Sequence, residues 1–210
     1  MREIEQSADV HIVDDDESLR RALDSLFRSV GLHTRLYGSA QEFLAAKSTP
    51  RSGCLVLDVR LPGTSGLEFQ EQLADLDIHL PVILMTGHGD IPMSVRAMKA
   101  GAVDFLPKPF RDQDMLDAVT AALQRDRARR SEMGDLEKVR ERYATLSPRE
   151  QQVMMLVTQG KMNKQVAGDL GLSEITVKIH RGAAMRKMGA RTLADLVRMA
   201  DLLKPRPKGG

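Results

Sequence analysis

The sequence is poor in cysteine and in aromatic residues, and it has no long apolar run. Its 210 residues include one cysteine, two tyrosines and no tryptophan. The single cysteine, Cys54, excludes an internal disulfide and a cysteine-based metal site, and its apolar surroundings in the sequence predict a buried thiol. No apolar run approaches the roughly 20 residues that span a bilayer, and the N-terminal MREIEQSADV lacks the apolar core of a signal peptide. These absences predict a cytoplasmic protein that has no contact with a membrane.

Charge is distributed unevenly along the chain. The formal net charge is +2, but residues 1–124 carry −7, residues 125–145 carry +2 and residues 146–210 carry +7. A chain of this length can hold two small domains, each with its own core. An acidic first half and a basic last third therefore predict two modules, of which the second faces a polyanion.

The first module alternates short apolar strands with amphipathic helices. The expected strands are VHIV at 10–13, HTRLY at 33–37, CLVL at 54–57, PVILM at 81–85 and VDFL at 103–106. The segments between them place apolar residues on one helical face, as Leu19, Leu23 and Leu26 do. Five strands, each followed by a helix, predict a doubly wound five-stranded parallel sheet of the α/β, flavodoxin-like class. In such sheets ligands bind beyond the carboxyl ends of the strands.

A charged helical segment follows this module. The helix that starts near Asp112 covers the sheet with apolar residues, and its pattern then thins out. The segment has no proline and one glycine, Gly134, so a long solvated helix that could kink at Gly134 is favoured over a disordered linker. We expect a first domain at 8–125, a helical linker at 126–143, a second domain at 144–204 and a disordered tail at 205–210.

The second module is predicted to form four short helices. SPRE at 147–150 is a capping box, with Ser147 as the N-cap and Pro148 as the first helical residue. The expected helices are 147–159, 163–170, 173–188 and 192–203. Residues 163–188 place a short helix, the turn GLS and a longer helix capped by Ser173 in succession. This order predicts an all-α helix-turn-helix domain, whereas the basic helix taken alone could equally be a solvated surface.

Polar side chains follow several of the expected strands. Asp14, Asp15 and Asp16 follow the first, and Asp58, Thr86 and Lys108 follow later ones. Because parallel strands end at one edge of the sheet, we expect these groups to meet there. An all-oxygen carboxylate cluster suits Mg²⁺, a carboxylate can attack phosphorus to form an aspartyl phosphate, and lysine and threonine can donate to the phosphoryl oxygens. Asp16 reads instead as a helix N-cap.

The motifs HIVDDD, LVLDVRLPGTSG, ILMTGHGD and AVDFLPKPF resemble, in order and spacing, the landmarks of receiver domains of two-component response regulators. The resemblance covers residues 8–125 and implies Asp58 as the phosphoacceptor. It also implies four Mg²⁺ ligands, with Asp14 acting mainly through water: Asp14, Asp15, Asp58 and the backbone carbonyl of Arg60. Lys108, in a cis peptide with Pro109, would hold the phosphoryl group, while Thr86 and Phe105 would move toward it as the switch.

The stretch from LSPREQQVMML to HRGAAMRKM resembles LuxR-type four-helix DNA-binding domains over residues 144–204. Together the two resemblances place the chain near the FixJ/NarL type of response regulator, close to the styrene-catabolism branch. They imply base contacts by Lys178 and Ile179, with Arg181 and Thr176 close by. They imply phosphate contacts by Asn163, Lys164 and Lys187. Gly182 stands where some relatives carry a long basic side chain, so that contact is not transferred.

Three functions compete for this combination of modules. The favoured one is a transcription factor that a sensor histidine kinase phosphorylates, that dimerises on phosphorylation and that binds double-stranded promoter DNA. RNA polymerase is expected as a further partner, and the regulator is expected to act as an activator. The second is an enzyme, an aspartyl-phosphate phosphotransferase or phosphatase. No second acid stands two residues after Asp58 to protonate a leaving group, which argues against it. The third is an adaptor, which the +7 output module disfavours.

Overall fold

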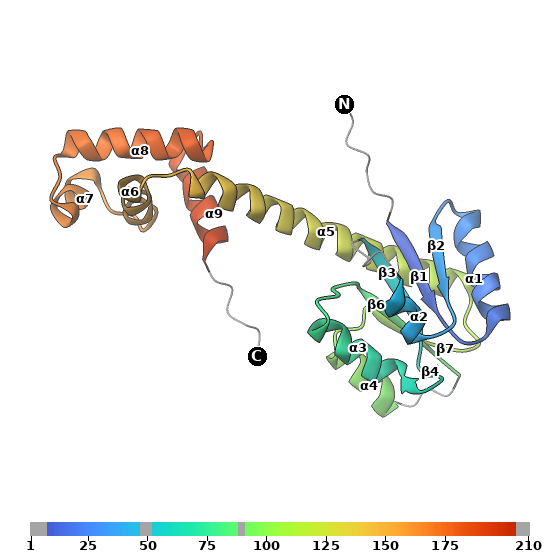
Figure 1. Ribbon diagram of the computed structural model, residues 1–210. Helices are drawn as coiled ribbons and strands as arrows, with labels where there is room; N and C mark the ends of the chain where they lie inside the picture. Colours follow the sequence, from blue (N-terminus) through green and yellow to red (C-terminus); the bar gives the residue numbers. More distant parts are fainter. Residues whose placement is uncertain (1–7, 47–51, 88–90, 205–210) are drawn as a thin grey trace. The chain divides into compact units, whose positions relative to one another are not determined.

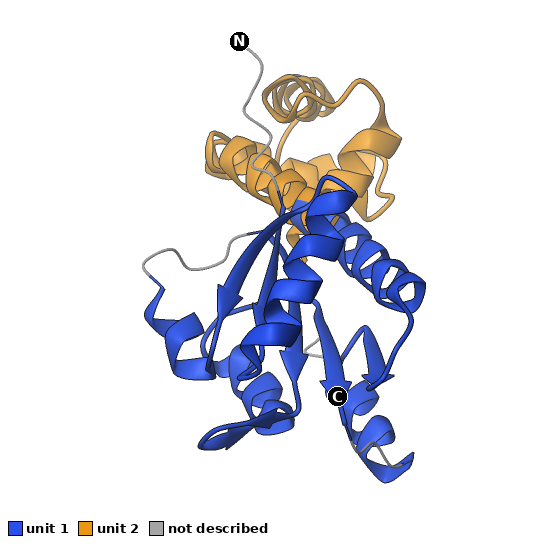
Figure 2. Cartoon of the chain, turned by 90° about the vertical axis from the view of Figure 1, so that its right-hand side faces the viewer, with its two compact units in different colours: residues 1–130 blue, residues 131–210 orange. Residues whose placement is uncertain are grey.

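The computed structural model describes residues 8–46, 52–87 and 91–204. The chain forms two compact units, residues 1–130 and residues 131–210 (Figure 2). No helix in these described ranges is long and apolar enough to cross a membrane. The tail that the sequence predicts at 205–210 lies outside the described residues.

The first unit is built on a five-stranded parallel sheet (Figure 1). Its strands run in the order β2-β1-β3-β6-β7, with the bounds β1 Asp9–Val13, β2 His33–Tyr37, β3 Gly53–Asp58, β6 Val82–Thr86 and β7 Asp104–Pro107. The doubly wound α/β fold that the sequence predicts is confirmed. Strand order reverses between β1 and β3, so the two strands that flank the reversal end side by side.

Helices cover both faces of this sheet. Their bounds are α1 Glu17–Ser29, α2 Ala40–Ala45, α3 Gly66–Asp75, α4 Ile91–Lys99 and α5 Asp112–Ala144. One core joins α1 and α5 to the sheet through side chains such as Phe27 and Val119, and the other joins α2, α3 and α4 through side chains such as Phe43 and Phe69. Successive strand residues alternate between the two cores, as Val56 and Leu57 do, because side chains point to opposite faces of a sheet.

A small hairpin after β3 was not expected from the sequence. It pairs β4 Arg60–Leu61 with β5 Thr64–Ser65 in antiparallel register. Pro62 and Gly63 connect the two, and Gly63 has a φ of +82°. Proline followed by a glycine of positive φ is typical of a type II turn, so the dipeptide carried a signal for this turn.

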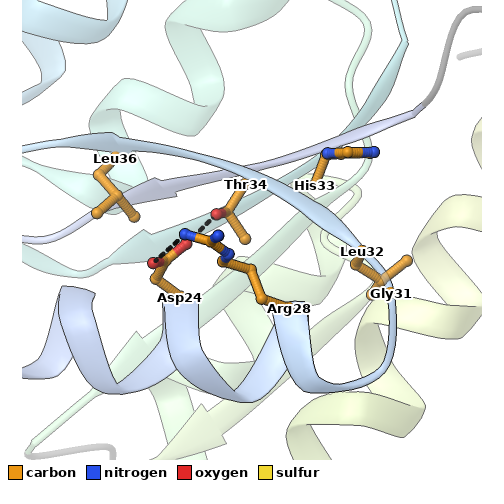
Figure 3. Close-up of a pocket in the computed structure, with 7 residues that line it drawn as sticks. All are labelled: Asp24, Arg28, Gly31, Leu32, His33, Thr34 and Leu36. Atoms are coloured by element: carbon orange, nitrogen blue, oxygen red, sulfur yellow. Dashed lines mark hydrogen bonds and ion pairs between the residues drawn. The ribbon is translucent and has the colours of Figure 1, made fainter.

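Strand β2 forms the exposed edge of the sheet and is tied to α1 beside a shallow pocket (Figure 3). Asp24 of α1 accepts a hydrogen bond from the Thr34 hydroxyl of β2, and its other oxygen lies 3.7 Å from the Arg28 guanidinium. The pocket is lined by Asp24, Arg28, Gly31, Leu32, His33, Thr34 and Leu36. Because Gly31 and His33 stand at the amino end of β2, this pocket is at the wrong end of the strands for the ligand site predicted above.

Helix α5 runs without interruption from Asp112 to Ala144, through Gly134. Its residue Asp126 is fully buried, although the sequence suggested a solvated segment from this point onward. The Asp126 carboxylate accepts hydrogen bonds from the backbone N–H of Gly53 at 3.0 Å, from Arg129 at 2.7 Å and from Arg130 at 2.8 Å. The first five residues of the predicted linker therefore belong to the first compact unit.

The second unit contains the four helices that the sequence predicts. They are α6 Pro148–Thr158, α7 Asn163–Leu170, α8 Glu174–Met188 and α9 Leu193–Leu203, and the last turns of α5 pack with them. The capping box of Ser147 and Glu150 is present at the start of α6, and the Ser173 hydroxyl caps α8. Val139 and Tyr143 of α5 pack on the same apolar core as Val153 and Val177, so the end of the linker helix is part of this domain.

Candidate functional site

Three carboxylates meet at the edge of the sheet where its strands end. Asp14 and Asp15 follow β1, and Asp58 is the last residue of β3. One carboxylate oxygen of each lies within 4.8 Å of the others. Asp14 is fully buried, Asp58 is 6% exposed and Asp15 is exposed. The structure therefore brings together the three aspartates that the sequence singles out.

The backbone around Asp58 is hydrogen-bonded and closely packed. The Val59 N–H donates to the Met85 carbonyl at 2.8 Å, and the Gly66 N–H donates to the Val59 carbonyl at 2.8 Å. A Cβ on Gly66 would lie 2.2 Å from the Asp58 carbonyl oxygen. Only glycine can stand at this position without moving the chain that carries Asp58.

Asp14 and Asp16 divide their roles as the sequence suggests. The Asp14 Oδ1 atom accepts from the Asp16 N–H at 2.8 Å, and the Asp14 carbonyl accepts from the Arg20 guanidinium. Asp16 caps α1 by accepting from the N–H groups of Ser18 and Leu19. Asp14 therefore turns one oxygen toward the backbone and keeps the other for the cluster.

The Lys108 ammonium joins the cluster from the end of β7. Its Nζ lies 2.7 Å from Asp14 Oδ2 and 3.2 Å from Asp58 Oδ1. The Lys108 N–H donates to the Thr86 carbonyl at 2.6 Å, which fixes the start of this loop to β6. The Lys108–Pro109 peptide is cis, as predicted.

The electrostatics of the cluster favour a bound cation. Burial, followed by the charge of Asp14, raises the pKa of the Asp58 carboxyl, while Lys108 and the backbone N–H of Arg60 act in the opposite direction. Burial lowers the pKa of Lys108, but its hydrogen bonds and charge pairing with Asp14 and Asp58 outweigh this, so the net change is upward. Lys108 stays charged, and its ammonium is paired with two of the three clustered carboxylates.

The two predicted switch residues lie on neighbouring strands. Thr86 ends β6 and is fully buried, and Phe105 lies on β7, where it is partly buried against the core that α3 and α4 cover. Their strands are adjacent, with Thr86 opposite Pro107 and Leu84 opposite Phe105. The placement suits a relay from the acidic cluster to the α4 side of the sheet.

In the second unit, α8 presents a mixed polar and apolar surface to solvent. Lys178 is exposed, and Ile175 and Ile179 are exposed to 75% and 63%. Val177 and Ala184, on the opposite side of the helix, are fully buried. An isoleucine pair that packing does not use, next to a lysine, can contact the apolar and polar edges of bases in a DNA groove.

Polar contacts tie α8 to the start of α7 and fix its own N-terminal cap. Asn163, the first residue of α7, accepts a hydrogen bond from Arg181 at 3.3 Å. The Thr176 hydroxyl lies 2.8 Å from the Ser173 hydroxyl, within the N-terminal cap. Lys164 is exposed at the start of α7. Asn163 and Arg181, two of the predicted DNA contacts, are therefore hydrogen-bonded to each other.

Lys187 forms an ion pair within the second unit. Its ammonium lies 2.7 Å from Glu150 Oε2 and 3.3 Å from the Thr145 carbonyl. The hydrogen bond from Lys187, with that of the Ser147 N–H, holds the pKa of Glu150 below its usual range. Sequence reasoning assigned Lys187 to DNA phosphate and did not anticipate this ion pair, because Glu150 stands 37 residues away in the chain.

Comparison with known proteins identifies the family to which each unit is similar. Residues 10–120 match the family described as response regulator receiver domain, and residues 144–200 match bacterial regulatory proteins, luxR family. The transcriptional regulatory protein FixJ of Rhizobium meliloti is 46% identical over 191 residues, which are 91% of this chain and 94% of that protein. The chain belongs to the FixJ-type response regulators.

Two further similarities refine its position among the FixJ-type regulators. Nodulation protein W of Bradyrhizobium diazoefficiens is 60% identical over 201 residues, which are 96% of this chain and 88% of that protein. The low-resolution structure of the response regulator StyR is 46% identical, covers 93% of this chain and 98% of its own, and superposes with a TM-score of 0.81. These matches confirm the predicted resemblance to the branch of the styrene regulator.

The family assignment decides between the competing functions. A receiver joined to a LuxR-type domain is a transcriptional response regulator, which takes its signal from a histidine kinase and binds DNA. FixJ is a transcriptional regulatory protein, so the enzymatic alternative is not favoured. Sequence reasoning missed three features of this regulator: the Arg20 contact with Asp14, the buried Asp126 and the Lys187–Glu150 pair. Asp14, Glu150 and Lys187 lie in motifs quoted above, but those motifs do not indicate these partners.

Proposed function

We propose that this regulator accepts a phosphoryl group on Asp58 with the help of Mg²⁺, dimerises through its receivers, binds promoter DNA and activates transcription, with RNA polymerase as a further partner. The observation that carries the proposal is the cluster of Asp14, Asp15 and Asp58 beside Lys108 at the sheet edge. Cytoplasmic location, a receiver at 8–125 and a DNA-binding domain at 144–204 belong to the same proposal, with the predicted linker 126–143 as a helical connection whose first residues pack on the first unit and whose last residues pack on the second core.

The donor set at the cluster fits Mg²⁺. Its side chains offer only oxygen, which hard cations prefer, and their mutual repulsion contributes to the raised pKa of Asp58. Asp14, Asp15, Asp58 and the Arg60 carbonyl would hold the ion. When bound, Mg²⁺ would neutralise negative charge on the carboxylates and on the phosphoryl oxygens.

The transfer itself is a displacement at phosphorus. A carboxylate oxygen of Asp58 forms the new O–P bond, the P–N bond to the kinase histidine breaks, and the imidazole keeps the electron pair. The Lys108 ammonium, now 3.2 Å from Asp58 Oδ1, would donate to the new phosphoryl oxygens. The Thr86 hydroxyl would donate a hydrogen bond to a phosphoryl oxygen. Phe105 would then move toward the space that Thr86 leaves.

We assign DNA reading to α7 and α8. Lys178 and Ile179 would contact base edges, with Thr176 and Arg181 beside them, and Asn163 and Lys164 would contact phosphates. The exposure of Lys178 and Ile179 supports this division. Lys187 would contact a phosphate while its ammonium stays paired with Glu150. We therefore expect Lys187 to contribute less to DNA affinity than Lys164 does.

Replacement of the acceptor tests the proposal. Asp58→Asn keeps the shape of the side chain but lacks the nucleophilic carboxylate, so labelling by radioactive acetyl phosphate in Mg²⁺ should disappear. Asp77→Asn, at an exposed aspartate of the same unit, is the matched control and should label like wild type. Full labelling of Asp58→Asn, with the label not moved to Asp14 or Asp15, would exclude Asp58 as the acceptor.

A further inference from the structure

The last turn of α5 contacts the carboxyl end of α8 within the second unit. The Arg142 guanidinium donates from Nη1 to the Met188 carbonyl oxygen at 3.0 Å. Met188 is the last residue of α8, and its carbonyl is one of the four that a helix leaves without an internal partner. A cation at this end also faces the negative pole of the helix.

The residue that follows α8 leaves room for this guanidinium. Gly189 has a φ of +72°, a left-handed conformation that favours glycine. A Cβ at Gly189 would lie 2.9 Å from Arg142 Nη1. The absence of a side chain at Gly189 therefore serves the helix end and the approach of Arg142 together.

A second contact joins the same two segments. The Lys187 ammonium donates to the carbonyl of Thr145, just past the end of α5, at 3.3 Å and pairs with Glu150 of α6 at 2.7 Å. The two contacts run in opposite directions: Arg142 donates to the α8 backbone, and Lys187 of α8 donates to the backbone after α5. Together they fix the end of α8 against a segment more than 40 residues earlier in the chain.

We propose that Arg142 is a positioning residue for sequence-specific DNA binding, holding the carboxyl end of the recognition helix α8 through the Met188 carbonyl. The proposal rests on the assignment of base reading to α8. Ser173 caps the start of this helix, and Arg142 supports its end, so the two fix the orientation in which Lys178 and Ile179 meet a groove. Arg142 lies on the one helix that begins at Asp112 of the receiver.

The experiment compares Arg142→Ala with Arg140→Ala in the full-length chain. Arg140 is an exposed arginine on the same helix, so both variants lose one positive charge. Binding is measured on a duplex that the wild-type chain enriches from a random library and on a scrambled duplex of the same composition. Hydrogen exchange of the peptide that covers residues 183–190 reports the end of α8 without reference to DNA.

We expect Arg142→Ala to lose about fivefold to tenfold in affinity for the enriched duplex, the factor that one hydrogen bond of ordinary net strength represents, and to lose little on the scrambled one. The 183–190 peptide should exchange faster than in Arg140→Ala. Arg142→Lys, which keeps a charged donor on a shorter reach, should fall between wild type and Arg142→Ala, and it serves if Arg142→Ala does not fold.

Two results would overturn the proposal. Equal losses on both duplexes, matching those of Arg140→Ala, would show that Arg142 acts only as a charge. Wild-type affinity of Arg142→Ala for both duplexes, with wild-type exchange of the 183–190 peptide, would show that the end of α8 needs no support from α5. A wild-type chain that enriches no duplex would instead refute the proposed DNA reading, a failure that the hydrogen exchange result does not share.

Discussion

His11 and Asp58 are buried polar side chains on neighbouring strands, and the first unit accommodates them in different ways. Asp58 lies beside Lys108, whose ammonium compensates its charge. His11 is 3% exposed, its Nδ1 lies 3.2 Å from the Tyr37 hydroxyl, and its Nε2 has no hydrogen-bond partner among the described residues. Burial lowers the pKa of His11 to about 4, so this side chain is neutral in the folded protein at pH 7.

The free energy of unfolding of the receiver should therefore fall as the pH drops below 6.5, the ordinary pKa of histidine. The unfolded chain takes up a proton on His11 near pH 6.5, and the folded chain resists it until about pH 4. The free energy of unfolding should decline across this window, on the order of 3 kcal/mol from His11 alone.

Urea unfolding of wild type and His11→Leu at several pH values measures this loss. The protein has two tyrosines and no tryptophan, so in a Tyr143→Phe background the fluorescence of Tyr37 reports the first unit. The wild type should lose more stability than His11→Leu between about pH 7 and pH 4. Parallel curves for the two proteins would contradict a neutral, buried His11.

At the scale of elements, α5 shows how a charged segment joins two domains without being solvated along its length. Asp126 fastens it to the start of β3, and Val139 and Tyr143 pack it into the second core. Gly53, whose N–H donates to Asp126, has a φ of +125°, and a Cβ there would lie 1.8 Å from the Asp9 carbonyl oxygen, so this contact point requires glycine.

Asp126→Ala should destabilise the first unit by about 3 kcal/mol, because it leaves two arginines and a buried N–H without their carboxylate. Thermal unfolding of the full-length chain measures the change. Asp135→Ala, at an exposed aspartate of the same helix, should leave the melting temperature unchanged or slightly higher, since alanine favours helix. Equal melting temperatures for the two variants would show that the Asp126 contacts are energetically neutral.

Helix α8 should divide base reading from phosphate binding. Lys178→Ala should cost on the order of 1–3 kcal/mol on the operator and much less on random DNA. Lys164→Ala should weaken both about equally and lower the salt slope by about one unit. Lys187→Ala should lower that slope less, because Glu150 shares its charge. Fluorescence anisotropy over a salt series measures all three, and equal losses on both DNAs for Lys178→Ala would exclude it from base reading.

For the whole molecule, one recognition helix gives little specificity, so two copies must be joined. The α4 face of the receiver exposes Ile91, Val95 and Met98 to 79%, 46% and 48%. We predict a monomer that becomes a dimer on phosphorylation through the face formed by α4, β7 and α5. These apolar side chains support that choice, because burying them in an interface removes them from water.

Sedimentation velocity with and without acetyl phosphate in Mg²⁺ measures the change of state. Val95→Arg should remain monomeric after phosphorylation, whereas Val30→Arg, at a similarly exposed valine at the end of α1, should still dimerise. A tight dimer in the unphosphorylated wild type would refute the switch, although it would leave DNA binding untouched.

Much of this protein could be predicted from local patterns in its sequence. Strand and helix periods, the cap at Ser147 and the order of the motifs around Asp58 anticipated the sheet, the four helices and the acidic cluster. The Pro62–Gly63 turn carried a signal that was not used. These features depend on residues close in sequence or on strand ends that a parallel sheet must bring together.

The sequence alone determined the two modules, the order of the five sheet strands and their helices, and the residues of the acidic cluster, because periodicity and turn chemistry act over a few residues. Only the tertiary structure decided that Asp126 is buried, that Lys187 pairs with Glu150 and that Arg142 reaches Met188. The two residues of the Lys187–Glu150 pair are 37 positions apart in the sequence, and Arg142 and Met188 are 46 apart. Charged side chains at such separations find partners only when packing brings their helices together, and no local pattern records that meeting.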